Sequence, residues 1–176
     1  MMKDDDCRPR DRALGGRAWV FGDNIDTDTL APGLYMKRPV EEIAEHCLEA
    51  VDPRFAKEVR AGDVVVGGEN FGIGSSREQA VAALKHLGVA AIVAKSFAGL
   101  FFRNCLNLGL AALTMRDTAR IRPGDRVTVD PQTGRVDDLT TGARYAAEPI
   151  PPHLAEMIRD GGLLAHLEKK LKAGRA

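Results

Sequence analysis

Residues 63–88 read DVVVGGENFGIGSSREQAVAALKHLG, a run in which three patterns follow one another. Asp63–Val66 is a short apolar segment typical of a buried strand, and the glycines between 67 and 74 interrupt it. From Ser75 the apolar residues recur at helical spacing as far as Leu87, and Gly88 is suited to a left-handed helix cap. The run therefore predicts a strand, a glycine-rich turn and a helix that begins at Ser75.

The same alternation continues on both sides of this run. A strand is predicted over 90–94, a helix from Ser96 as its N-cap to Gly109, and a strand over 110–115. On the N-terminal side we expect a strand over 17–21 and a short helix that Pro39 opens and that extends to Leu48. Alternating strands and helices favour a parallel sheet with right-handed crossover connections.

The pattern changes after residue 115. Residues 126–130 and 135–139 form a hairpin pattern around Pro-Gln-Thr-Gly, and 142–147 fit a third short strand. From Pro151 the chain is helical, with an interruption at Gly161-Gly162. The sequence thus predicts one α/β domain over residues 17–176, with a mixed or parallel sheet, crossover helices and an extra β layer. Residues 1–16 are predicted to be a disordered N-terminal tail.

Composition excludes several classes of protein. The 176 residues carry 25 basic and 25 acidic side chains, so no basic field favours nucleic acid. No apolar run approaches the roughly 20 residues that cross a membrane, and the N-terminus does not resemble a signal peptide, so we expect a cytoplasmic protein. Cys7, Cys47 and Cys105 are scattered, which predicts no metal site on this chain, and the last two fit buried apolar positions.

The corner between the predicted strand and helix is the strongest candidate site. Its glycines allow the backbone to approach a ligand closely, and a helix N-terminus attracts anions. Ser75-x-x-Glu78 also fits a capping box, in which the serine only satisfies backbone donors. A capping box leaves Ser76 and Arg77 unexplained, and Arg77 opposes the helix dipole, so a carboxylate ligand is its expected partner. The residues alone leave both interpretations open.

Two further sets of residues are candidates. Asp26 and Asp28 lie in the loop 22–28, where they are either turn residues or part of a site. Lys37 and Arg38 follow a few residues later, and their charges suit an anionic group.

Three runs in one order, 22–28, 68–78 and 95–104, resemble the small subunits of 3-isopropylmalate dehydratase. The chain looks like the shorter, archaeal-type branch, which includes the homoaconitase and dimethylmalate dehydratase small subunits. The group is similar to the swivelling domain of aconitase, which implies a β/β/α fold. It also implies a hydro-lyase subunit that is active only with a large subunit, which carries a 4Fe-4S cluster.

The resemblance implies residue roles and a small diacid substrate. Ser75 would remove the substrate proton, and Ser76 and Arg77 would hold a carboxylate, with Asp26 and Asp28 near the site. The expected reaction interconverts 2- and 3-isopropylmalate through isopropylmaleate in leucine biosynthesis. The loop with Lys37 and Arg38 would select the third substituent, and two cations there suit an extra carboxylate. Ile73 and Gln79 differ from the Cys and His often found in relatives.

Alternatives therefore remain open. One is the same chemistry on homoaconitate, citraconate or methylmalate, or dimethylmalate. Another, of a different class, is a carboxylate-binding domain without catalysis. The isolated chain could also form homo-oligomers through a surface that a large subunit would otherwise cover.

Overall fold

The computed structural model describes residues 13–174, and its strands form one seven-stranded sheet in the order β4-β3-β2-β1-β5-β6-β7. The parallel half consists of β1 (Leu14–Val20), β2 (Val64–Gly67), β3 (Ala91–Ala94) and β4 (Ala111–Thr114). The antiparallel half consists of β5 (Arg126–Asp130), β6 (Arg135–Asp138) and β7 (Arg144–Ala146). The predicted α/β class and parallel crossover unit are confirmed.

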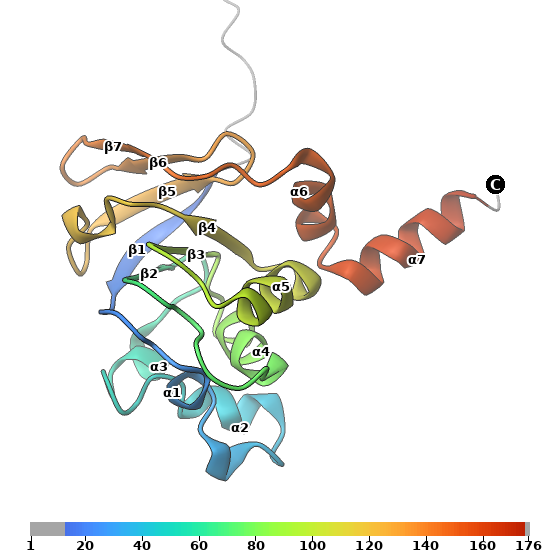
Figure 1. The fold of residues 1–176 in the computed structure, drawn as a ribbon, viewed down its shortest axis with the longest axis horizontal. Helices are drawn as coiled ribbons and strands as arrows, with labels where there is room; N and C mark the ends of the chain where they lie inside the picture. Colours follow the sequence, from blue (N-terminus) through green and yellow to red (C-terminus); the bar gives the residue numbers. More distant parts are fainter. Residues whose placement is uncertain (1–12, 175–176) are drawn as a thin grey trace, which may run out of the picture.

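Strand β1 belongs to both halves of the sheet. Leu14 to Arg17 pair antiparallel with β5, whereas Ala18 to Val20 pair parallel with β2. Figure 1 shows β5, β6 and β7 as a layer above the parallel strands. Valines of the parallel strands, such as Val66 and Val93, share one buried cluster with Val127 and Val136 of this layer. The extra β layer is therefore a continuation of the same sheet, folded over one of its faces.

Helices cover the opposite face of the parallel strands (Figure 1). They are α1 (Thr27–Leu30), α2 (Val40–Glu45), α3 (Phe55–Glu58), α4 (Glu78–His86) and α5 (Gly99–Leu108), with a short 3₁₀ turn η2 (Gly33–Tyr35). A second 3₁₀ turn, η3 (Thr118–Arg120), lies beside the antiparallel layer, where Arg120 stacks on Tyr145 of β7. Because side chains alternate along a strand, Val65 and Ile92 face this side and pack with Leu84 of α4. Cys47 and Cys105 are fully buried in the same core, and burial raises the pKa of both thiols well above their usual range.

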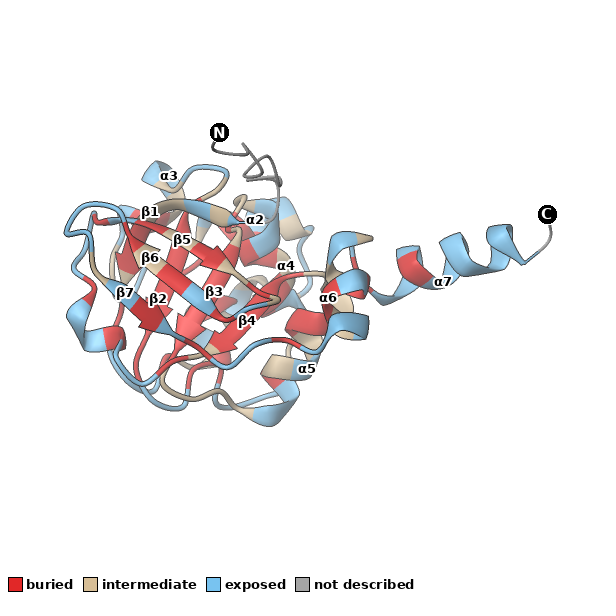
Figure 2. Ribbon diagram, turned by 90° about the horizontal axis from the view of Figure 1, so that it is seen from above, coloured by how far each residue is buried: buried red, intermediate tan, exposed pale blue. Residues whose placement is uncertain are grey.

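Two helices follow the sheet. α6 (Pro152–Arg159) packs on α5, and α7 (Leu163–Ala173) extends away from the body (Figures 1 and 2). The break between them at Gly161-Gly162 agrees with the prediction. Helix α7 is the longest described helix at 11 residues. Within residues 13–174, no helix has the length and apolar character that a membrane span requires.

Several predicted boundaries are wrong. Strand β1 begins at Leu14, so residues 14–16 belong to the sheet; their pairing with β5 orders a segment whose two glycines gave no apolar pattern. The rest of the predicted tail, residues 1–12, lies outside the described residues. Helix α2 ends at Glu45, and Leu48 adopts φ 60° in the turn that follows.

The two helices nearest the candidate site also begin later than predicted. Helix α5 begins at Gly99 with Ala98 as its N-cap, while the Ser96 hydroxyl accepts the backbone N–H of Asn70 at 2.8 Å. Helix α4 begins at Glu78 with Arg77 as its N-cap. In both cases a bridge to a neighbouring loop, Asp26 with Ile73 and Phe71 with Phe97, holds the residues before the helix outside helical geometry, which periodicity within one segment does not reveal.

Candidate functional site

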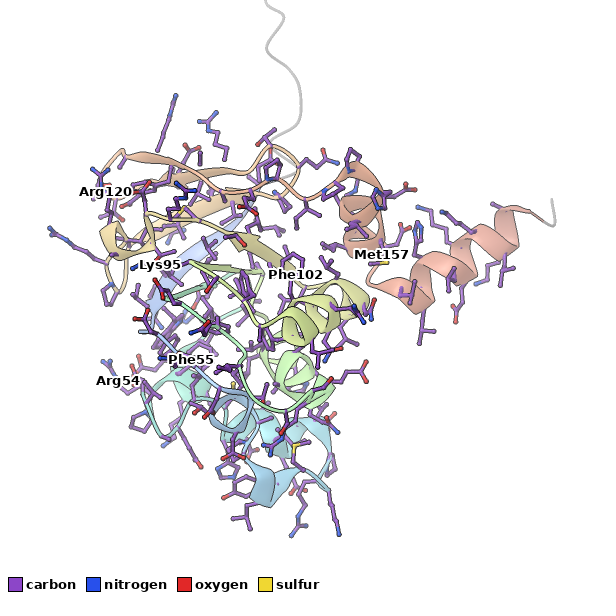
Figure 3. The ribbon with its side chains drawn as sticks, viewed as in Figure 1. Arg54, Phe55, Lys95, Phe102, Arg120 and Met157 are labelled. Atoms are coloured by element: carbon purple, nitrogen blue, oxygen red, sulfur yellow. The ribbon has the colours of Figure 1, made fainter. Side chains whose placement is uncertain are left out.

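Three loops meet where the parallel strands end. The loop after β1 is joined to the loop after β2 by hydrogen bonds from Gly72 N to Ile25 O at 2.7 Å and from Thr27 N to Ile73 O at 2.9 Å. The loop after β3 is joined to the same segment, because Lys95 N donates to Gly68 O at 3.0 Å. Lys95 marks this edge in Figure 3. The result is a layered platform at the carboxyl edge of the sheet, the usual place for a site in an α/β fold.

Gly72 is required by this platform. Its φ is +80°, and a Cβ added there would lie 2.1 Å from the Phe101 ring of α5. Any side chain would therefore combine an unfavourable backbone conformation with a collision against a ring that is 2% exposed. This close passage over α5 directs the chain from Gly72 towards the serines.

Replacing Gly72 with alanine is expected to destabilise the protein by about 3 kcal/mol, through positive-φ strain and displacement of the buried ring. The matched control is Gly124→Ala, where φ is +89° but no atom lies within 4 Å of the new Cβ. That variant should lose only about 1 kcal/mol, the cost of strain alone. Urea unfolding of both variants measures the difference, and equal losses would contradict the role assigned to the Phe101 contact.

Ser75 and Ser76 lie exposed on this platform, between Gly74 and the first turn of α4. The capping-box interpretation is wrong, because α4 begins at Glu78 and no side chain in the described part of the protein caps it. Neither serine hydroxyl has a hydrogen-bond partner within residues 13–174. Both are therefore available to a ligand, and the first-turn N–H groups of α4 lack a side-chain acceptor at the same place.

Arg77 has a partner within the chain, contrary to the expectation that only a ligand would supply one. Its Nη1 donates to Asp28 Oδ1 at 2.6 Å and to the Ala31 carbonyl at 3.0 Å. Asp28 also accepts the Gly33 backbone N–H at 3.0 Å. The hydrogen bond from Arg77, followed by that from Gly33, lowers the pKa of the Asp28 carboxyl. These contacts fix Nη1 and leave Nε and Nη2 as donors for a carboxylate.

Asp26 has a different role from Asp28. Its side chain accepts the Thr29 backbone N–H at 2.7 Å and caps α1, and its backbone forms a parallel bridge with Ile73. Asp26 therefore connects the serine segment to α1 as a turn residue. Of the paired aspartates, Asp28 is the one in contact with a predicted site residue.

Lys37 and Arg38 are both exposed after η2. Arg38 Nε lies 3.8 Å from Glu42 Oε2, whereas Lys37 has no ion pair within residues 13–174. The loop begins close to the site, since a Cβ added at Gly33 would lie 3.6 Å from Arg77 Nη2. No hydrogen bond or ion pair within the described chain joins either cation to the two serines or to Arg77.

Three polar side chains that hold the platform together were not predicted from the sequence. Asp23 Oδ1 accepts the Glu69 N–H at 2.8 Å, and the Asn70 side chain donates to Asn24 Oδ1 at 2.9 Å. Asn24 and Asn70 both have positive φ, which asparagine tolerates better than most residues. A loop rich in Asp and Asn signals a turn, but the sequence does not reveal that the two turns bind each other.

The described residues do not fit an iron–sulfur cluster, because Cys47 and Cys105 are buried in the apolar core and three thiolates would be needed. One other group could in principle hold a metal, since ligand atoms of Glu156, Asp160 and His166 lie within 4.8 Å of one another. Asp160 already accepts from His166 Nδ1 at 2.6 Å and from Lys169 Nζ at 2.7 Å. That arrangement is an ion-pair network between α6 and α7.

Comparisons with known proteins agree with this geometry. The family model of the aconitase C-terminal domain matches residues 34–118. The homoaconitase small subunit of Methanothermobacter thermautotrophicus is 45% identical over 92% of this chain and 94% of its own length. The 3-isopropylmalate dehydratase small subunit 1 of Archaeoglobus fulgidus is 49% identical over 85% and 93%. The crystal structure of 3-isopropylmalate dehydratase (LeuD) from Methanocaldococcus jannaschii superimposes with a TM-score of 0.86 at 39% identity, covering 93% and 99%.

Residues 34–118, which carry Ser75 and Ser76 at the carboxyl edge of the sheet (the serine corner), are thus of the aconitase C-terminal type. The chain belongs to the family of 3-isopropylmalate dehydratase small subunits, to which the homoaconitase small subunit is related. The family and fold class predicted from the three sequence runs are confirmed.

Proposed function

We propose that this chain is the small subunit of a two-chain 3-isopropylmalate dehydratase, which interconverts 2- and 3-isopropylmalate through isopropylmaleate in leucine biosynthesis. The observation that carries the proposal is a pair of serine hydroxyls that have no partner within residues 13–174 and lie beside an arginine that the chain itself holds in place. Relatives 44–49% identical to this chain are named as small subunits of that enzyme. A cytoplasmic location stays a prediction.

Ser75 is proposed to take the proton from the carbon next to a substrate carboxylate. Ser76 and the free edge of Arg77 are proposed to bind that carboxylate. The uncapped N-terminus of α4 supports these roles, because its N–H groups stabilise negative charge that develops at this corner. Asp28 acts as a positioning residue, since it holds the arginine and stands outside the serine pair.

A large subunit is proposed to close over this corner and to carry the iron–sulfur cluster, for which the described residues of this chain do not fit as ligands. Apolar side chains near the site support closure. Leu34 is 84% exposed next to Gly33, Ile73 is 42% exposed two residues before Ser75, and Leu100 is 52% exposed beside Phe101. Exposed apolar side chains around a polar site are typical of a surface that a partner covers.

The direct test combines this chain with a cluster-bearing large subunit under anaerobic conditions and measures hydration of isopropylmaleate. We expect activity from the complex and none from either chain alone. Turnover by the isolated small subunit would contradict the proposal. If the chain bound malate-like diacids but never associated with such a partner, the non-catalytic carboxylate-binding function would be favoured instead.

A second candidate substrate is a longer acid of the homoaconitate type, favoured by the exposed Lys37 and by the 45% identity to a homoaconitase small subunit. If Lys37 binds the extra carboxylate, Lys37→Ala should raise KM for cis-homoaconitate roughly tenfold or more. The same change should leave isopropylmaleate hydration nearly unaltered, since an isopropyl group offers no charge to the lysine. Arg38→Ala is the matched control, because Arg38 already pairs with Glu42.

A further inference from the structure

An open cavity of about 660 Å³ lies at the opposite end of the parallel strands from the serine corner. It is formed where β1 and β2 begin, with the turn 57–63 on one side and Arg126 of β5 on the other. The seven residues of β1 separate the two ends by about 20 Å, so a ligand in this cavity would not touch the serines.

The cavity concentrates positive charge in a chain that is neutral as a whole. Four cations line it, and two acids oppose them. The cations are Arg17, Lys57, Arg60 and Arg126, and the acids are Glu58 and Asp63.

Both acids are engaged by groups of the protein. Asp63 is 5% exposed and accepts the backbone N–H groups of Arg17 and Arg60 and the Trp19 indole N–H, each at 3.0 Å. Arg17 donates to the Glu58 carbonyl at 3.0 Å, approaches its carboxylate at 4.0 Å, and lies over the Trp19 ring at 4.3 Å. Arg17, Glu58 and Asp63 are thus held in place by contacts with one another and with the backbone.

The other three cations have no such partners. Within residues 13–174, the side chains of Lys57, Arg60 and Arg126 form no ion pair or hydrogen bond. Lys57 and Arg60 come from the segment 57–63, and Arg126 comes from β5 on the other side of the cavity. The scaffold beneath them is well packed, because Phe55 of α3, labelled in Figure 3, is fully buried and packs edge-on against Trp19 and Phe21.

The backbone of β1 adds a donor. The Arg17 N–H points to Asp63 and away from β5, and residues two apart in a strand direct their N–H groups to the same side. The Gly15 N–H therefore also faces the turn 60–63, where no side chain of its own covers it. Backbone donors and several unpaired cations together recognise phosphate oxygens.

We propose that this cavity binds a multivalent phosphate anion of the diphosphate class, at a site separate from the substrate site. Two linked phosphate groups offer more anionic oxygens than a single phosphate group, so they can pair with more of Lys57, Arg60 and Arg126. The proposal does not rest on the proposed dehydratase function, because it concerns the chain alone.

The test is calorimetric titration of the full chain with inorganic pyrophosphate and, separately, with inorganic phosphate. We expect one pyrophosphate per chain, bound more tightly than phosphate. Lys57→Ala, Arg60→Ala and Arg126→Ala should each weaken pyrophosphate binding roughly tenfold. Lys172→Ala, which removes a cation from the distant helix α7, is the control and should not change the affinity. Unfolding curves confirm that each variant remains folded.

Three results would overturn the proposal. The first is that the three cavity variants bind pyrophosphate as tightly as wild type does. The second is that wild type binds phosphate as tightly as it binds pyrophosphate. The third concerns the acidic residues Asp4, Asp5 and Asp6, because the chain enters the sheet at Leu14 beside this cavity. If replacing all three with asparagine raised the affinity for pyrophosphate, we would conclude that the acidic N-terminal segment is the natural occupant of the cavity. Unchanged affinity would support a free anion.

Discussion

Ser75→Ala is expected to lower kcat of the assembled enzyme by about a thousandfold while KM changes little. General-base catalysis by a positioned side chain contributes roughly 10²- to 10⁴-fold, and alanine removes the proposed base without disturbing the carboxylate site. Steady-state hydration of isopropylmaleate by the reconstituted complex measures both constants. Near-normal turnover would show that Ser75 is not the base.

The control for this prediction is Ser76→Ala. Ser76 is proposed to bind the substrate carboxylate, so its loss should raise KM and leave kcat closer to wild type. Both serines are exposed and have no partner within the described chain, so neither change should alter the free energy of unfolding by more than about 0.5 kcal/mol. Equal kinetic effects in the two variants would contradict the division of roles.

The charge that activates Ser75 cannot come from Arg77 alone. An isolated arginine about 4 Å away stabilises an alkoxide by roughly 4 kcal/mol at an effective dielectric constant near 20. Arg77 is not isolated, because Asp28 accepts from it at 2.6 Å and opposes its charge. The N–H groups at the start of α4 and exclusion of water by a partner must therefore supply much of the stabilisation, which explains why the chain should be inactive by itself.

The order of strands and helices could be predicted from sequence because each element has a local signal. The apolar run Val64–Val66 and the left-handed Gly109 at the end of α5 are visible without knowledge of neighbours. The start of β1 could not be predicted, since Gly15 and Gly16 have no apolar side chains and are ordered by pairing with β5. The folding of β5–β7 over the parallel strands was expected only as an extra layer.

The candidate site was predicted as a set of residues but not as a geometry. Local spacing made Ser75 a helix cap, whereas the bridge between Asp26 and Ile73 and the bond from Arg77 N to Ser75 O at 2.8 Å show that the chain is held in a bend before α4 begins. The pairing of Arg77 with Asp28, 49 positions apart, has no local signal. Such contacts depend on how two loops meet in space. The residue types show that Arg77 and Asp28 can pair, but they do not show that the two side chains lie close together.

Arg77→Lys is expected to lower kcat/KM of the assembled enzyme by roughly a hundredfold. The guanidinium is proposed to serve two purposes, because Nη1 donates to Asp28 and to the Ala31 carbonyl, while Nε and Nη2 form no hydrogen bond within residues 13–174 and can donate to the proposed carboxylate. A lysine keeps the charge but has a single nitrogen, so it cannot hold Asp28 and bind a carboxylate in a two-point manner. A loss of less than about threefold would show that charge alone is sufficient at this position.

The same variant has a readout independent of activity. Because the hydrogen bond from Arg77 lowers the pKa of Asp28, weakening it should raise that pKa towards the ordinary aspartate value. In the wild type the ion pair is fully present above the unfolded pKa of Asp28 and is lost as pH falls through the lowered, folded value. NMR titration of the Asp28 carboxyl in wild type, Arg77→Lys and Arg77→Gln should therefore give a rising pKa in that order. An unchanged pKa of Asp28 in Arg77→Gln would mean that Arg77 and Asp28 are not paired in solution. The positioning role proposed for Asp28 would then be wrong.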